Sequence, residues 1–187
     1  YNMFNVMLPR FNIKTTFVDP SNPKNFSDAC KKNTRLFFAE SLGNPKLDVL
    51  DLDKISLESK KCKVPFMVDN TVATPALLNP IKHGANIVIY SLTKYINGNG
   101  TALGGAIIDA GNFDWSNGNF PEFTSPSPGY HGLVYYEALG PAAFIAKVRV
   151  EGLRDLGAAI SPFNSFQILQ GLETLDVRMK KHSENAL

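Results

Sequence analysis

Two short and almost entirely apolar runs constrain most strongly what this chain can fold into. They occupy residues 64–68 and 87–90, and polar residues follow each of them directly. A strand that is apolar on both sides of its pleat is typical of a parallel sheet that helices cover on both faces. The two runs therefore predict strands of a mainly parallel sheet.

Segments with strand and helix patterns alternate along the chain. We expect strands at Ile13–Val18, Thr34–Ala39, Pro65–Val68, Asn86–Tyr90 and Leu103–Asp109. Apolar spacing and capping residues predict helices at Pro23–Lys32, Val49–Ser59, Ala142–Asp155 and Pro162–Lys181. Residues 74–82 predict a loop with a short helical turn, and residues 112–130 predict a long ordered loop. This alternation implies an α/β domain with a mainly parallel sheet between helices.

The totals exclude several classes of function. The chain has 187 residues, of which 44% are hydrophobic and 19% charged, enough for one sizeable core. A net charge of +2 is too small to indicate a nucleic-acid partner or an acidic membrane surface. His83, His131 and His182 are dispersed and make no metal-binding pattern. Cys30 and Cys62 form no CxxC pair and no disulfide framework, which fits a reducing cytosol.

Targeting and nucleotide-binding patterns are missing from the sequence. The longest apolar stretch, residues 140–146, stops at Lys147 and is too short to span a membrane. The first residues lack the basic and apolar regions of a signal peptide. Neither a P-loop, nor a complete G-x-G-x-x-G unit, nor a G-x-S-x-G elbow is present. Because the chain does not begin with Met, we expect it to belong inside a longer protein.

Polar side chains follow three of the predicted strands, where parallel sheets place ligand chemistry. Asn44 lies after the strand that ends at Ala39, Asp69 follows the next strand, and Ser91, Thr93 and Lys94 follow the one after it. Groups of these kinds are what an enzyme needs to hold pyridoxal 5'-phosphate, so we expect this cofactor here. An amine forms a Schiff base, a carboxylate partners the ring nitrogen, and hydroxyls donate to the phosphate.

Each of these residues also has a plainer interpretation. Most lysines are solvated at the surface, and an aspartate after a strand commonly serves as a turn or cap residue. Hydroxyls at a strand end often do the same, and an Asn before Pro is a turn signal. An extended segment would place the hydroxyls of Ser91 and Thr93 on one side. The position of Lys94 between an apolar strand and a glycine-rich loop favours the functional interpretation.

Three motifs in register resemble the Cys/Met-metabolism pyridoxal-phosphate enzymes. They are Glu40-Ser41-Leu42-Gly43-Asn44-Pro45, Val68-Asp69-Asn70-Thr71-Val72-Ala73-Thr74-Pro75 and Ser91-Leu92-Thr93-Lys94-Tyr95. Segments 113–115, 130–133, 137–141 and 169–175 look most like the O-acetylhomoserine sulfhydrylase branch of that family. The resemblance covers essentially the whole chain. It implies a large domain of the aspartate-aminotransferase type, known as fold type I.

Carried over by position, the resemblance implies a role for each candidate residue. Lys94 would form the internal aldimine and act as the catalytic base. Asp69 would face the pyridine nitrogen, Ser91 and Thr93 would bind the phosphate, and Asn44 would contact the ring oxygen.

The resemblance also implies a reaction, γ-replacement in methionine biosynthesis. O-acetyl-L-homoserine and sulfide (or a thiol) would give homocysteine (or methionine) and acetate. The enzyme would be a cytoplasmic homotetramer built as a dimer of dimers. A γ-lyase of the same family and a non-catalytic α/β interaction fragment are the alternatives.

The resemblance finally implies a domain that is incomplete at both ends. Residues 1–160 would be part of the cofactor-binding large domain, and residues 161–187 a helix leading to a C-terminal domain. The family's ring-stacking tyrosine, glycine turn and neighbour-subunit phosphate ligands lie before the position of Tyr1. Its substrate-carboxylate arginine lies beyond that of Leu187. We therefore expect this piece alone to bind cofactor poorly and to be inactive.

Overall fold

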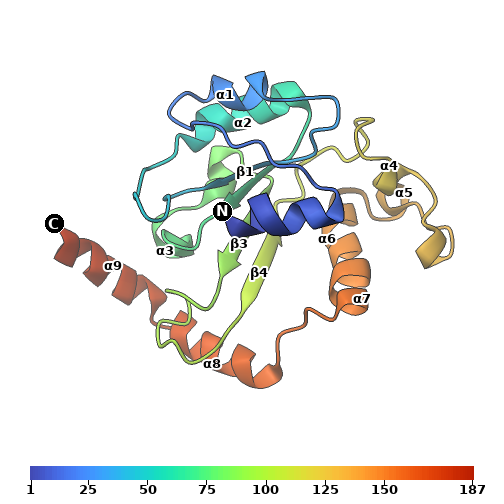
Figure 1. Cartoon of the computed structure of the whole chain (residues 1–187). Coiled ribbons are helices and arrows are strands. Elements are labelled where there is room, and N and C mark those ends of the chain that lie inside the picture. Colours follow the sequence, from blue (N-terminus) through green and yellow to red (C-terminus); the bar gives the residue numbers. More distant parts are fainter.

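A four-stranded sheet forms the centre of the protein, and a computed structural model describes all residues from 1 to 187 (Figure 1). The strands β1 (Phe37–Glu40), β2 (Phe66–Asp69) and β3 (Ile87–Ser91) are parallel. Strand β4 (Gly105–Asp109) runs antiparallel to β3 and closes the spatial order β1-β2-β3-β4. The predicted mainly parallel sheet is therefore confirmed, with one antiparallel strand at its edge.

The register of the three parallel strands aligns their carboxyl ends. Glu40 of β1 pairs with Asp69 of β2, and Asp69 in turn pairs with Ile89 of β3. The loops that follow these strands therefore leave the sheet at one edge. Parallel α/β sheets bind ligands at that edge, beyond the carboxyl ends of their strands.

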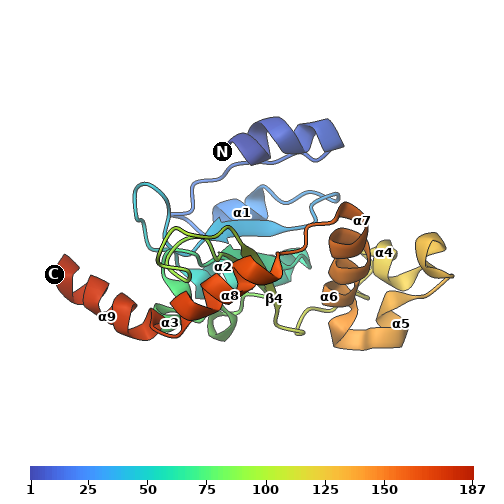
Figure 2. The same ribbon diagram turned by 90° about the horizontal axis from the view of Figure 1, so that it is seen from below.

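Helices flank the sheet, and the three long ones are α2, α8 and α9. They are α1 (Lys24–Asp28), α2 (Leu52–Cys62), α3 (Thr74–Leu77), α4 (Pro121–Thr124), α5 (Tyr135–Leu139), α6 (Ala143–Lys147), α7 (Arg154–Leu156), α8 (Pro162–Leu172) and α9 (Leu175–Ala186). Short 3₁₀ helices cover Leu8–Phe11, Pro80–His83, Pro128–Tyr130 and Gly140–Ala142, and π-helical turns cover Met3–Met7 and Val148–Leu153. Figure 2 shows α9 and the α4–α7 group on opposite sides of the molecule.

The two faces of the sheet bury different clusters, because successive side chains of a strand point to opposite faces. Phe66, Val68 and Val88 pack with residues of α1 and α2. Ile87, which precedes Val88, packs instead on an aromatic cluster of Trp115, Phe120, Phe123 and Tyr135. Burial on both faces explains why the strand sequences are almost entirely apolar.

Helix α2 shows how local sequence sets an element's limits. The Asp51 side chain accepts a hydrogen bond from the backbone N–H of Lys54 at 3.1 Å, which makes Asp51 the N-cap. The helix therefore begins at Leu52, although its apolar pattern predicted a start at Val49. It ends where Lys63 adopts a left-handed conformation with φ of 54°.

Several predicted elements differ from the structure. The expected strand at Ile13–Val18 is wrong, because that segment pairs with no other strand and β-propensity alone does not form one. The predicted helix Ala142–Asp155 is divided by the π-helical turn at Val148–Leu153. The predicted helix Pro162–Lys181 is two helices, α8 and α9, separated by Glu173 and Thr174.

Other boundaries shift by a few residues. The predicted helix Pro23–Lys32 shortens to α1, and the predicted strands Thr34–Ala39 and Leu103–Asp109 begin only at Phe37 and Gly105. The long loop of residues 112–130 contains α4 and a 3₁₀ turn.

None of the helices combines the length and the apolar character that crossing a lipid bilayer requires.

Substitution of Ile55 tests how much the apolar cluster between α1, α2 and the sheet contributes to stability. Ile55 is 0% exposed in α2, whereas Leu57 in the same helix is 56% exposed. We expect Ile55→Ala in the intact protein to lower the free energy of unfolding by about 2–5 kcal/mol, because it opens a cavity. The control Leu57→Ala should stay within about 0.5 kcal/mol of the wild type. Urea unfolding measures both, and equal losses in the two variants would contradict this packing.

Candidate active site

The candidate site lies where three loops leave the carboxyl ends of β1, β2 and β3. The first loop carries Asn44, the second begins at Asp69, and the third carries Lys94. Hydrogen bonds join each loop to its neighbour. The structure therefore brings the three predicted segments together at one edge of the sheet.

Two buried polar residues join the first loop to the second. Ser41 donates through its hydroxyl to Oδ1 of Asn70 at 2.7 Å, and its backbone N–H donates to the carbonyl oxygen of Asp69 at 3.0 Å. The amide nitrogen of Asn70 donates to the Thr74 carbonyl (3.1 Å) and the Leu78 carbonyl (2.9 Å). Because these groups are buried and satisfied, they fix the path of the chain immediately after Asp69.

Thr71 joins the second loop to the third. Its hydroxyl donates to Oδ1 of Asp69 at 2.5 Å and accepts the backbone N–H of Ser91 at 2.8 Å. The backbone N–H of Thr71 also donates to the same carboxylate oxygen, at 3.0 Å. Both bonds engage Oδ1, and no protein group donates to Oδ2 of Asp69. The carboxylate is thus oriented and keeps one oxygen for a ligand.

Lys94 lies one turn beyond the end of β3. Its backbone N–H donates to the Ser91 carbonyl at 3.2 Å, and its own carbonyl accepts from Gly98 at 2.8 Å. The side chain is exposed, and its amine forms no hydrogen bond or ion pair within the chain. The ordered backbone therefore presents an amine that no group of the chain occupies.

The two predicted hydroxyls differ in their environment. The Ser91 hydroxyl has no partner in the chain. The Thr93 hydroxyl accepts the backbone N–H of Gly104 at 3.1 Å and lies 3.3 Å from the Gly104 carbonyl, to which it donates. The expectation that strand alternation aligns the two hydroxyls is wrong, because β3 ends at Ser91 and Thr93 lies in a turn.

Asn44 lies in an exposed turn held by its own backbone. Its N–H donates to a carboxylate oxygen of Glu40 at 2.8 Å, and the neighbouring Gly43 N–H donates to the Asp48 carbonyl at 3.0 Å. The side-chain amide of Asn44 has no partner in the chain. The amide is therefore available to a ligand, and its predicted contact with the cofactor stays a prediction.

These residues fit the donor set for pyridoxal phosphate. The amine of Lys94, one oxygen of Asp69, the Ser91 hydroxyl and the Asn44 amide are all unpaired at one edge of the sheet. Sequence reasoning assigned no role to Ser41, which is fully buried directly after β1. The only signal in the sequence that could have pointed to Ser41 is its position directly after an apolar strand.

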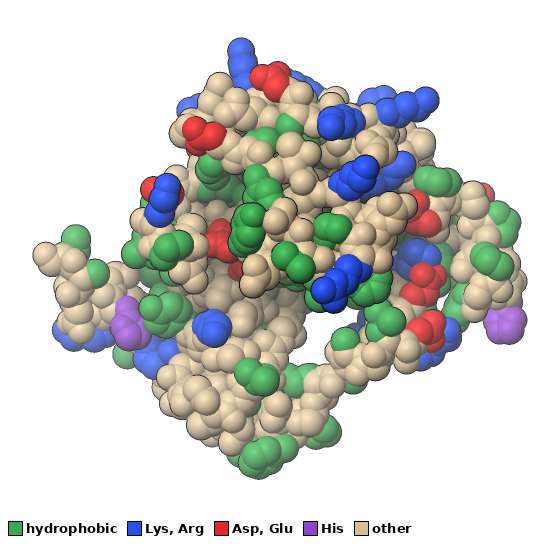
Figure 3. Space-filling model, in the orientation of Figure 1, with side chains coloured by type: hydrophobic (Ala, Val, Ile, Leu, Met, Phe, Trp, Pro, Cys, Tyr) green, Lys and Arg blue, Asp and Glu red, His purple; other side chains and the backbone are tan.

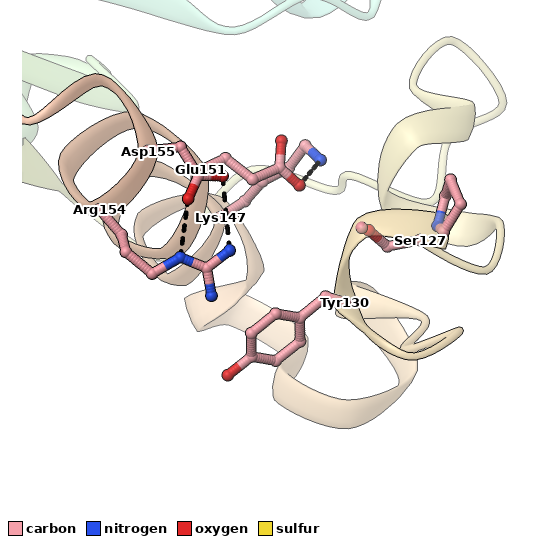
Figure 4. A pocket seen from close by; sticks show the side chains of 8 residues that line it. Ser127, Tyr130, Lys147, Glu151, Arg154 and Asp155 are labelled. Carbon is pink, nitrogen blue, oxygen red and sulfur yellow. Dashed lines mark hydrogen bonds and ion pairs between the residues drawn. The ribbon is translucent and has the colours of Figure 1, made fainter.

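A charged pocket of about 340 Å³ lies apart from this edge, between α6–α7 and the loop around Tyr130 (Figure 4). Its charges are already paired. Lys147 contacts Glu151 at 2.5 Å, and Arg154 contacts Asp155 at 2.8 Å. The bond to Arg154 lowers the pKa of Asp155, and Asp155 in turn raises the pKa of Arg154. A ligand would have to break these pairs, so we do not assign the pocket a binding role.

An apolar groove and an opening also interrupt the surface of the protein. An apolar groove of about 410 Å³ lies between the sheet and the aromatic cluster, and its lining includes Met67, Ile87 and Trp115. An opening also separates the exposed link between α7 and α8, residues 157–161, from the body of the molecule (Figure 3). Neither the groove nor the charged pocket is lined by any of the five candidate residues. The candidate site is therefore identified by its unpaired polar groups and not by either of these hollows.

Comparison with known sequences places the chain among pyridoxal-phosphate enzymes. A family model for Cys/Met metabolism PLP-dependent enzymes matches residues 1–187. The O-acetyl-L-homoserine sulfhydrylase of Leptospira meyeri is 54% identical over 195 residues, which cover 100% of this chain and 44% of the relative. The homocysteine/cysteine synthase of Saccharomyces cerevisiae is 45% identical over 190 residues, covering 100% of this chain and 43% of that protein.

Solved structures show the same similarity. An O-acetylhomoserine (thiol)-lyase of Campylobacter jejuni, with N'-pyridoxyl-lysine-5'-monophosphate, has a TM-score of 0.94 and 41% identity. The match covers 99% of this chain and 46% of that one. An O-acetylhomoserine sulfhydrylase of Wolinella succinogenes has a TM-score of 0.80 and 36% identity, covering 94% and 47% of the two chains. The predicted fold class is confirmed, and the chain spans less than half the length of these relatives.

Loss of the Thr71 hydroxyl should loosen the candidate site. In the intact protein, Thr71→Val removes the acceptor of the Ser91 N–H and one donor to Asp69. We expect a loss of about 1–3 kcal/mol in the free energy of unfolding and faster hydrogen exchange at the Ser91 amide. Thr71→Ser keeps the hydroxyl and should keep the amide protected. Unchanged protection of Ser91 in Thr71→Val would contradict the link between the loops.

Proposed function

The chain belongs to the family of Cys/Met metabolism PLP-dependent enzymes, and from this premise we propose that the whole protein is an O-acetylhomoserine sulfhydrylase. It would convert O-acetyl-L-homoserine and hydrogen sulfide into L-homocysteine and acetic acid, in methionine biosynthesis. A thiol in place of sulfide would give the corresponding thioether. The names of the relatives from Leptospira meyeri and Wolinella succinogenes support this reaction over elimination.

One observation carries the proposal. An unpaired lysine amine and a carboxylate with one unpaired oxygen lie on adjacent loops that Thr71 ties together. Bound pyridoxal phosphate would supply an electron-withdrawing ring that stabilises negative charge at the α-carbon of the substrate. The residues of this edge account for holding that ring and for moving protons beside it.

Lys94 has two proposed roles. Its amine would hold the cofactor covalently. In the reaction the same amine would take the proton from the α-carbon of the substrate and move a proton at the β-carbon, while the C–O bond at the γ-carbon breaks to release acetate and sulfide forms the new C–S bond there. An exposed side chain on an ordered turn suits both roles, because the amine must move while its backbone stays in place.

Asp69 is proposed to pair with the protonated ring nitrogen. Two hydrogen bonds from Thr71 orient the carboxylate and leave its second oxygen for that nitrogen. A carboxylate there keeps the ring protonated, so that negative charge from the α-carbon is drawn away from the reacting atoms.

The remaining candidates are proposed to orient the cofactor. The Ser91 hydroxyl donates to the phosphate, and the Asn44 amide donates to the ring oxygen. Thr93 also binds the phosphate, provided its O–H turns away from the Gly104 carbonyl to which it now donates. This switch requires only a rotation about the Cβ–Oγ1 bond of Thr93, because the oxygen then stays in place and the Gly104 N–H continues to donate to it.

The organisation of the whole protein is part of the same proposal. Residues 1–160 would contribute to the cofactor-binding large domain, and α8 and α9 would lead toward a C-terminal domain. The active form would be a cytoplasmic homotetramer. The length of the relatives supports an active site that residues outside this chain complete, so the isolated chain would be inactive.

Replacement of Lys94 tests the assignment directly. In the full-length enzyme, Lys94→Ala should lose the yellow colour of the bound cofactor, and turnover should fall by about 10²–10⁴-fold or more. Borohydride reduction of the wild type, followed by peptide mass spectrometry, should place the pyridoxyl label on Lys94. The control Lys82→Ala removes an exposed lysine from another turn and should leave colour and turnover unchanged. A label on a different lysine would overturn the assignment.

The products of the reaction separate replacement from elimination. Incubated with O-acetyl-L-homoserine and sulfide, the full-length enzyme should release acetate and homocysteine in equal amounts. A γ-lyase would instead release ammonia and an α-keto acid. A colourless full-length protein with neither set of products would favour a non-catalytic role.

A further inference from the structure

Arg178 of α9 reaches the turn that carries Lys94. Its Nη1 donates to the carbonyl oxygen of Tyr95 at 2.7 Å, and its Nη2 donates to the carbonyl oxygen of Ile96 at 3.3 Å. Tyr95 and Ile96 are the two residues directly after Lys94. One guanidinium therefore holds two successive peptide groups next to the proposed cofactor lysine.

The same guanidinium is anchored at the junction of α8 and α9. Nη2 also donates to the carbonyl oxygen of Gly171 at 2.6 Å, and Nε donates to the hydroxyl of Thr174 at 3.1 Å. All three nitrogens of Arg178 are thus engaged. A planar guanidinium bonded on several sides has little freedom to move, so it transmits the position of the helices to the turn.

The carbonyls that Arg178 binds have no donor in the turn itself. The backbone bonds of this turn use the carbonyls of Ser91, Leu92 and Lys94. Arg178 therefore supplies the donors that the turn lacks at Tyr95 and Ile96. Bonds from a charged donor are stronger than bonds between neutral groups.

Two glycines make the close approach possible. A Cβ on Gly171 would lie 1.9 Å from the carbonyl oxygen of Asn97, which backbone atoms cannot accommodate. A Cβ on Gly98, whose φ is +75°, would lie 2.7 Å from Nη1 of Arg178. Both positions therefore need glycine so that α8, the turn and Arg178 can meet.

Apolar and aromatic contacts reinforce the attachment. The buried side chain of Ile96 packs with Ile168, Leu175 and Met179 of the two helices. The ring of His182, one turn beyond Arg178, meets the ring of Tyr95 edge-on at 5.4 Å. Helix α9 also packs against α3, which follows the Asp69 loop. Helix α9 therefore contacts both the lysine turn and the helix that follows the Asp69 loop.

We propose that Arg178 is a positioning residue for Lys94, holding the lysine turn through the carbonyls of Tyr95 and Ile96. The inference rests on the proposed function of Lys94, because it assigns Arg178 the task of keeping that amine where proton transfer occurs. A misplacement of about 1 Å can lower a rate about 10²-fold, so fixing the turn has a kinetic consequence.

Variants of the full-length enzyme test this role. Arg178→Met removes all the bonds, Arg178→Gln keeps a shorter donor, and Lys180→Met changes an exposed residue of α9 as the control. We expect kcat to fall about 10–10²-fold in Arg178→Met and less in Arg178→Gln, with KM changing less than about twofold. Lys180→Met should match the wild type.

Two readouts separate positioning from general stability. Hydrogen exchange at the amides of residues 94–98 should speed up in both Arg178 variants while the amides of β2 and β3 stay protected. The cofactor-free variants should also form the borohydride-trappable link to Lys94 more slowly than the wild type. If Arg178→Met does not fold, Arg178→Gln carries the same tests.

The outcomes distinguish this inference from the proposed function. Normal kcat, normal exchange at residues 94–98 and normal labelling of Lys94 in a folded Arg178 variant would overturn the positioning role alone. A wild-type pyridoxyl label on another lysine would overturn the proposed function, and this inference with it. Loss of overall protection without any change in kcat per folded enzyme would reduce Arg178 to a stabilising residue.

Discussion

The hydroxyl of Thr71 is the interaction on which the geometry of the site depends. It connects two loops that are twenty residues apart, because it donates to the Asp69 carboxylate and accepts the N–H of Ser91. Parallel strands with aligned ends bring these loops to the same edge, but register alone does not orient a carboxylate. With both Thr71 donors on Oδ1, the carboxylate has a defined orientation and its other oxygen remains unpaired.

The faces of the sheet stabilise the fold, whereas the ends of its strands carry the candidate functional groups. Its two faces bury independent apolar clusters, one against α1 and α2 and one against the aromatic residues around Trp115. The candidate polar groups belong to neither cluster, because they lie beyond the strand ends. Unpaired groups such as the amine of Lys94 can therefore stay exposed without an uncompensated buried charge. The structure holds their backbones and leaves their functional atoms free.

The sequence predicted well those elements whose burial requires an apolar composition. The strands β2 and β3 lie within one residue of the expected ranges, because burial on both faces leaves apolar runs. Ile13–Val18 has the same β-branched character but no partner strand, so its composition alone predicted a strand that does not form. Placing Asn44, Asp69, Ser91 and Lys94 at strand ends needed only the parallel topology. Thr93 could not be resolved, because its bond to Gly104 depends on where β3 ends.

The proposed pair of Lys94 and Asp69 is held by two anchors with different origins. Asp69 is fixed at the sheet edge through Thr71, whereas the turn of Lys94 is fixed by Arg178 from the junction of α8 and α9. These anchors share no hydrogen-bond partner, so disturbing one leaves the bonds of the other intact. The sheet edge therefore sets the position of the Asp69 carboxylate, and the C-terminal helices set the position of the turn that carries the Lys94 amine. Their relative position is therefore set by how α8 and α9 pack on the lysine turn, which Ile96 and the close contact at Gly171 determine.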